Sequence, residues 1–201
     1  MKSYRRLVLA AAAATMSVLA LSGCGSSSAG DAATLGSTGI PDDWLRDEVE
    51  SVLVAKGQPS TASDPSLVQQ TLGRMITIEL VDRVAAQEGV VVTEGQIDEF
   101  LANYDSQLGG RDAVEQQLIQ QNISPSMIRS IVKLQMQAQA LGIKLDPRGS
   151  AEEQGTAVFN AVVKLSDELD TTVSPRYGTW DPTQLQVGPV PNDLSSPPTL
   201  G

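Results

Sequence analysis

The stretch QTLGRMITIELVDRVAAQEGVVVTEGQ, residues 70–96, contains most of one long helix and the start of the next. Upstream, Asp64 and Pro65 form an N-cap followed by proline in the first turn, and Gly89 is a typical C-terminal stop. Apolar residues recur every fourth position between these ends, and a second set widens the apolar face: Val68, Leu72, Ile76, Leu80 and Val84, with Met75, Ile78, Val81 and Ala85. A face this wide predicts a central helix that several neighbours contact.

Five further segments have helical periodicity, so we expect a mainly α fold, a bundle of about six helices. T-x-x-Q at residues 93–96 and S-x-x-E at residues 150–153 are capping boxes that each open a helix. Ser124 followed by Pro125 opens another, which we expect Gly142 to end. The predicted helices other than the central one begin near residues 41, 93, 112, 124 and 150.

Two stretches lack this periodicity, residues 32–36 (AATLG) and residues 171–180 (TTVSPRYGTW). We expect them to form a short β pairing between the two ends of the domain, because a lone strand leaves its backbone groups unpaired. The chain from Asp181 onward contains five prolines and little periodicity. The predicted domain therefore spans residues 32–182, and a Pro-rich tail at 183–201 is expected to be disordered or loosely laid on the surface.

The first 24 residues have the pattern of an export signal. Residues 1–6, MKSYRR, are basic, and residues 7–21 carry no charge. This apolar run is short for a membrane span of about 20 residues. Leu21-Ser22-Gly23-Cys24 follows and contains the only cysteine of the chain. It resembles the lipobox of bacterial lipoproteins, in which the cysteine thiol receives a diacylglyceryl group and the chain is cleaved just before it.

The lipobox resemblance implies a signal peptide at residues 1–23 and lipid attachment at Cys24, with a flexible spacer completing residues 24–31. The protein would then be anchored to the cell membrane through its lipid, on the extracytoplasmic face. The alternative is an ordinary secreted protein with a chance cysteine near the cleavage site.

Composition excludes several classes of function. Acidic residues outnumber basic ones by 24 to 14, for a formal net charge of −10, which argues against nucleic acid and against electrostatic docking on anionic lipid. The chain has no histidine, which removes the usual base near neutral pH and most transition-metal sites. No phosphate-binding glycine loop is present. We therefore expect no enzyme, no catalytic residue, no cofactor, no metal and no small-molecule substrate.

A few residues allow two interpretations. The acids Asp42, Asp43, Asp47 and Glu48 cluster at a helix start, where they complement the helix dipole; the alternative is an acid/base or calcium site. The methionines of the domain form either core or an adaptable binding surface; they are Met75, Met127 and Met136.

The order of these parts resembles the N-terminal domain of the SurA/PrsA family of extracytoplasmic chaperones, a domain type also met in the peptide-binding part of trigger factor. The A-x-x-x-G run of the family corresponds to Ala85–Gly89, followed by the apolar residues 90–92 and the cap Thr93. Residues 97–141 repeat the order of helices that follows in the family. Residues 173–180, VSPRYGTW, resemble the segment that closes the domain.

The resemblance implies a SurA N-terminal-like fold and a non-catalytic chaperone that shelters unfolded exported proteins in an apolar concave surface between helices. Longer relatives insert a parvulin prolyl isomerase domain, but residues 143–150 are too short for a domain of at least ~50 residues. The alternative is an accessory envelope lipoprotein that binds one dedicated protein partner. No residue of a peptide-binding surface is assigned.

The closing segment also allows two interpretations. Arg176 and Tyr177 either contribute to a client surface or serve packing. In the second case Arg176 pairs with an acid of the same domain, and Tyr177 packs over the helices with its hydroxyl at the surface.

Overall fold

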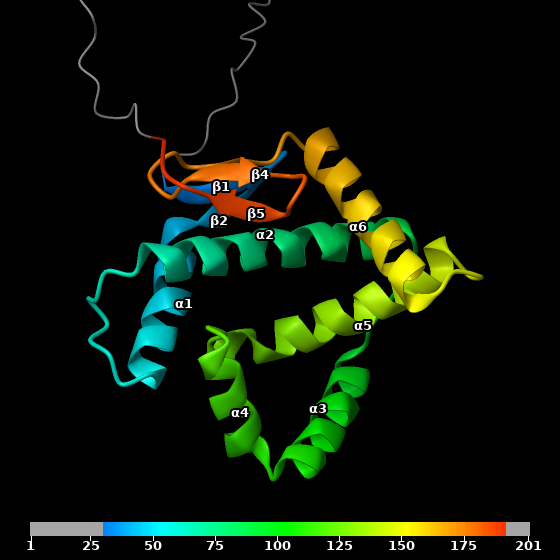
Figure 1. Ribbon diagram of the computed structural model, residues 1–201, viewed down its shortest axis with the longest axis horizontal. Helices are drawn as coiled ribbons and strands as arrows, with labels where there is room; N and C mark the ends of the chain where they lie inside the picture. Colours follow the sequence, from blue (N-terminus) through cyan, green and yellow to red (C-terminus); the bar gives the residue numbers. More distant parts are fainter. Residues whose placement is uncertain (1–29, 192–201) are drawn as a thin grey trace, which may run out of the picture.

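The computed structural model describes residues 30–191 as a helical bundle with short strands along one side (Figure 1). The helices are α1 (Asp42–Ala55), α2 (Pro65–Gln87), α3 (Glu94–Leu108), α4 (Arg111–Gln120), α5 (Ile128–Leu145) and α6 (Ala151–Glu168), with a 3₁₀ turn, η1, at Pro125–Met127. The strands are β1 (Asp31–Leu35), β2 (Thr38–Pro41), β3 (Thr172–Val173), β4 (Thr179–Asp181) and β5 (Gln186–Gly188). The expected mainly α class with a short β pairing is confirmed.

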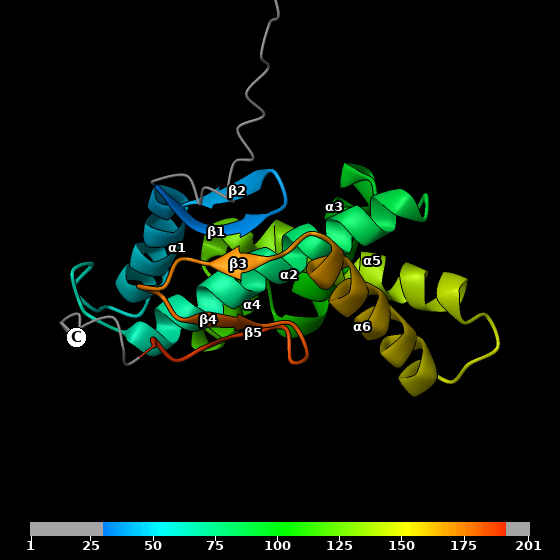
Figure 2. The ribbon, with the colours of Figure 1, turned by 90° about the horizontal axis from the view of Figure 1, so that it is seen from above.

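Helix α2 is the centre of the fold. It packs against α1, α5, α6, β1 and β5, and the strands lie over it in Figures 1 and 2. Seven of the nine residues in its two predicted apolar sets are buried, and the other two, Val68 and Ile78, are partly buried against the core. The width of the apolar face therefore did predict a helix with neighbours on several sides.

The predicted caps are present. The Asp64 carboxylate accepts a hydrogen bond from the Leu67 amide at 3.0 Å, and both capping boxes form, Thr93 with Gln96 and Ser150 with Glu153. Gly89 has a φ of +66°, a left-handed conformation that lets the chain leave α2.

The expected end of α5 at Gly142 is wrong, because α5 continues to Leu145. Gly142 lies inside the helix, where it faces α6. A Cβ at this position would lie 3.0 Å from Gln154 Cβ. The glycine thus allows α5 and α6 to approach closely, a packing role that its sequence neighbours do not reveal.

The predicted β pairing between the two ends of the domain is confirmed. Strand β1 pairs antiparallel with β3, Ala33 opposite Val173 and Thr34 opposite Thr172. The sheet also contains β2, which forms a hairpin with β1 and was not predicted, giving the order β2-β1-β3. Both ends of the described chain lie on this strand side of the molecule (Figure 1).

The expectation that residue 183 begins a disordered tail is wrong for the residues up to 191. Strand β5 pairs antiparallel with β4 and packs on α2. The Gln69 amide donates to the carbonyl oxygens of Tyr177 and Gly188, both at 3.2 Å. Gly178, at a φ of +140°, leaves room for the Gly188 carbonyl, which a Cβ would overlap. The domain therefore extends beyond the predicted boundary at residue 182.

Candidate functional site

The predicted lipid attachment site, Cys24, lies outside the described residues, as do the signal peptide at 1–23, most of the spacer and the tail beyond residue 191. Lipidation thus stays a prediction. Within residues 30–191, no helix is long and apolar enough to cross a membrane.

The acidic cluster divides between two structural roles. Asp42 and Asp43 lie in the first turn of α1. Glu48 is buried and accepts hydrogen bonds from the hydroxyls of Ser124 and Ser126, the second at 2.7 Å. Its carboxylate joins α1 to the start of η1. No group of three or more His, Cys, Asp or Glu side chains in the described part of the chain is arranged to hold a metal ion.

Arg176 and Tyr177 have the geometry of the packing interpretation. Both donate to Asp42 Oδ1, Arg176 Nη2 at 2.5 Å and the Tyr177 hydroxyl at 2.7 Å. The guanidinium also lies 4.9 Å from the centre of the Tyr177 ring. Burial, and then the neighbouring Asp42 carboxylate, raise the pKa of Tyr177 to about 12. This cluster fastens the closing segment to the start of α1.

The three methionines differ. Met75 and Met127 are buried in the core, whereas Met136 is partly exposed on α5. Met136 belongs to a hollow of about 290 Å³ between α3 and α5, here called the apolar groove. The groove is lined by Val91, Val92, Gln96, Phe100, Gln135, Met136, Gln139, Ala140 and Ile143.

Two helix faces and one loop build the apolar groove. On α5, Met136, Ala140 and Ile143 follow one another at steps of four and three residues, which places them on one face. On α3, Phe100 stands one turn after Gln96. The loop from Gly89 to Thr93 adds Val91 at the end. Val91 is 77% exposed and Ile143 is 54% exposed, so these apolar side chains are open to solvent.

The groove borders an inner cavity of about 220 Å³ between α3, α4 and α5. Phe100 and Gln135 line both spaces. The Phe100 ring stacks on Tyr104 with a centroid distance of 6.1 Å. Phe100 thus forms part of the wall between the groove and an apolar interior space.

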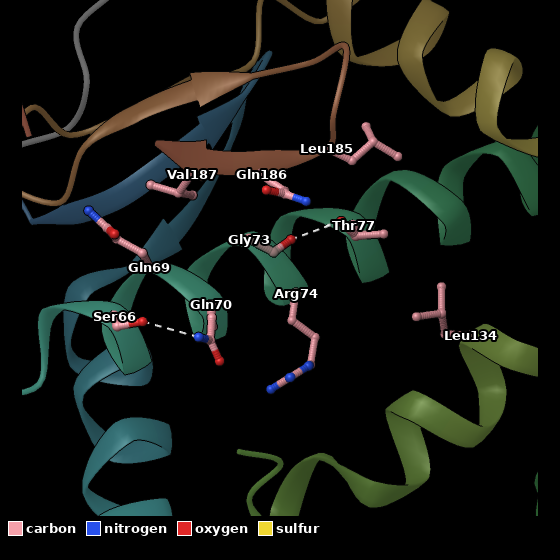
Figure 3. Close-up of a pocket in the computed structure, with 10 residues that line it drawn as sticks. All are labelled: Ser66, Gln69, Gln70, Gly73, Arg74, Thr77, Leu134, Leu185, Gln186 and Val187. Carbon is pink, nitrogen blue, oxygen red and sulfur yellow. Dashed lines mark hydrogen bonds between the residues drawn. The ribbon is translucent and has the colours of Figure 1, made fainter. Parts of the chain in front are cut away.

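A second hollow lies between α2, α5 and β5 and is here called the β5 cleft (Figure 3). Its volume is about 500 Å³. Polar side chains of α2 occupy one part, and apolar side chains from β5 and α5 occupy another. The lining residues are Ser66, Gln69, Gln70, Gly73, Arg74, Thr77, Leu134, Leu185, Gln186 and Val187.

The chemistry of the apolar groove is that of a surface for apolar chains. No charged side chain lines the groove, and its polar lining residues are three glutamines. The side chains of Gln135 and Gln139 are exposed on α5. An amide both donates and accepts, so these side chains can bind the backbone of an extended peptide of any sequence.

Sequence reasoning did not find this surface, although one signal was present. The apolar residues Met136, Ala140 and Ile143 of α5 repeat at helical spacing, beside the buried residues of the same helix such as Val132 and Leu141. A second apolar stripe on one helix indicates either a second helix packed on it or a surface open to solvent. Only the position of α3 relative to α5 distinguishes the two.

Comparison with models of known protein families, with curated proteins and with solved structures finds no match to this chain.

Proposed function

We propose that this protein is a membrane-anchored extracytoplasmic lipoprotein, tethered through Cys24, that acts as a non-catalytic chaperone for unfolded exported polypeptides. The observation that carries the proposal is the apolar groove, in which Val91 and Ile143 are more than half exposed beside Met136 and Phe100. Single exposed apolar residues are normal in folded proteins, but apolar side chains gathered in one hollow are typical of an interaction surface.

The physics of binding is the burial of apolar surface. An unfolded chain exposes apolar side chains, and each Å² removed from water contributes about 25 cal/mol. The groove, at about 290 Å³, is near the lower limit of ligand pockets, ~300 Å³, and fits a few side chains. Binding is therefore weak and readily reversed, as a chaperone that releases its client requires. Met136 suits varied clients because its unbranched thioether adapts in shape.

An aggregation assay tests the proposal. A purified chain of residues 25–201, which lacks the predicted lipid attachment site, should suppress the aggregation of several unrelated unfolded proteins. The double variant Val91→Ser/Ile143→Ser should need about fivefold more protein for the same suppression, the equivalent of ~1 kcal/mol of lost apolar contact. Phe159→Ser is the matched control, because Phe159 is 39% exposed on α6 and does not line the groove.

Two outcomes would contradict the proposal. Suppression of no client, together with co-purification of one stoichiometric protein, would indicate an accessory lipoprotein with a dedicated partner. Turnover in a prolyl-peptide isomerisation assay would indicate an enzyme.

A further inference from the structure

Lys56 and Arg74 converge on one residue, Asn122, in the loop after α4. Arg74 Nη1 donates to the Asn122 carbonyl oxygen at 2.6 Å, and Arg74 Nη2 donates to the Gln121 carbonyl oxygen at 3.3 Å. Lys56 Nζ donates to the side-chain oxygen Asn122 Oδ1. Two cationic groups from α2 and the end of α1 thus surround the same loop.

Neither cation has a carboxylate partner among residues 30–191. Eight other basic residues of this part form salt bridges, and besides Lys56 and Arg74 only Arg148 does not. Acidic residues outnumber basic ones in this protein, so the sequence offers many carboxylates that could have paired with Lys56 and Arg74. Partial burial without an anionic neighbour lowers the pKa of Arg74. The site therefore favours an anion that the described chain does not supply.

The carbonyl groups at the end of α4 do not balance this charge. A helix C-terminus corresponds to about −0.5 of an elementary charge, whereas Lys56 and Arg74 carry one full positive charge each. The guanidinium has five N–H donors and uses two here, so three remain for a ligand.

Arg74 also lines the β5 cleft, so a bound anion would contact the other residues of this cleft. Figure 3 shows Arg74, Ser66 and Gln70 on α2, with Val187 on β5, Leu185 just before β5 and Leu134 on α5. Gln70 donates to Ser66 Oγ at 3.1 Å, which leaves the Ser66 hydroxyl proton free to bind a ligand. The cleft thus combines a basic, hydrogen-bonding part with an apolar part.

We propose that the β5 cleft binds the C-terminal carboxylate of an extended polypeptide, with Arg74 holding the carboxylate and the apolar residues near β5 and on α5 contacting the last side chains. This inference rests on the proposed function, because the ligand is the end of a client chain. A cleft of about 500 Å³ that also contains apolar side chains is larger than an inorganic anion alone would fill.

A chain terminus fits better than an acidic side chain. Segments rich in Asp and Glu are repelled by a protein of net charge −10. Every polypeptide ends in one carboxylate whatever its sequence, so a site for this group recognises clients without selecting among them. A guanidinium binds a carboxylate through two parallel N–H bonds, which gives the site its specificity.

Fluorescence anisotropy with the purified chain of residues 25–201 tests the inference. The probes are one N-terminally labelled apolar peptide ending in leucine, made as the free acid and as the C-terminal amide, and an amide with one internal glutamate. The free acid should bind about 10-fold more tightly than either amide, the range expected for a charge-assisted hydrogen bond. Salt at 0.5 M should reduce this difference because it screens the charges.

Arg74→Gln should reduce the preference for the acid and leave the affinity for the amide unchanged. Arg148→Gln is the matched control, since Arg148 also lacks a carboxylate partner among the described residues but does not line the β5 cleft. The affinities of the acid and the amide are also compared on the unaltered protein. This comparison tests the carboxylate site even if Arg74→Gln fails to fold.

The outcomes separate the two proposals. Equal binding of acid and amide overturns the carboxylate site and leaves the chaperone proposal standing. Tight binding of the internal-glutamate amide overturns the assignment to a chain terminus. Binding of none of the peptides, together with no suppression of aggregation, overturns both proposals.

Discussion

At the scale of single residues, Asp42 links parts of the chain that are far apart in sequence. One of its carboxylate oxygens accepts from both Arg176 and Tyr177, 134 and 135 residues away. An acid partner for Arg176 in the same domain could be predicted from the sequence, but its identity could not, because the domain contains many acids. Glu48 belongs to the same cluster, and its burial depends on Ser124 and Ser126, which no local pattern places beside it.

The Tyr177 hydroxyl should make stability depend on alkaline pH. Its pKa is about 12 in the folded protein and near 10 in an unfolded chain. A raised folded pKa contributes stability that is fully present below pH 10 and is lost as the pH rises from 10 to 12. Urea unfolding should show the free energy of unfolding falling over this window, and falling less in Tyr177→Phe. Equal pH dependence in the two proteins would contradict the assigned environment.

At the scale of elements, the helix starts could be predicted because caps are local. Asp64, Thr93 and Ser150 bind amides within three residues of themselves. Glycines inside helices could not be interpreted in this way. Gly73 faces Val187 of β5 and Gly142 faces Gln154 of α6, so the role of each depends on a neighbouring element that the helix itself does not specify.

Two glycine-to-alanine changes in helices should have opposite effects. Gly155→Ala on α6 meets no other atom within 4 Å and should raise the free energy of unfolding by ~0.5–1 kcal/mol, since alanine favours the helix. Gly142→Ala gains the same helix propensity but forces a Cβ against Gln154, so we expect a net loss of ~1 kcal/mol. Urea unfolding measures both, and stabilisation by Gly142→Ala would show that α5 and α6 separate easily.

At the scale of the whole molecule, the order of helices and the pairing of the chain ends could be predicted, whereas the surfaces between elements could not. Strand β5 has three residues and stands among prolines, so its pairing with β4 and its packing on α2 leave almost no periodic signal. The apolar groove likewise depends on how far α3 stands from α5. Periodicity tells which faces are apolar, and only the packing tells which of them stay open.

Truncation tests the extended domain boundary. A chain that ends at residue 182 loses β5 and the turn before it, and with them the partly buried Leu185 and Val187 and the bond from Gln69 to Gly188. We expect it to be less stable than the full chain by ~2 kcal/mol, about half the value for burying two such side chains completely. A chain that ends at residue 191 is the control, because it keeps every described contact of β5. Equal stability of the two truncated chains would show that β5 contributes little.

The strand side of the molecule has a geometric consequence. The described chain enters and leaves there, whereas α3 and α4 lie on the other side of α2 and α5 (Figure 1). A lipid on Cys24 would attach to the chain on the strand side, opposite α3. The apolar groove would then lie away from the point of attachment, and the length of the linker ahead of β1 would limit its height above the bilayer.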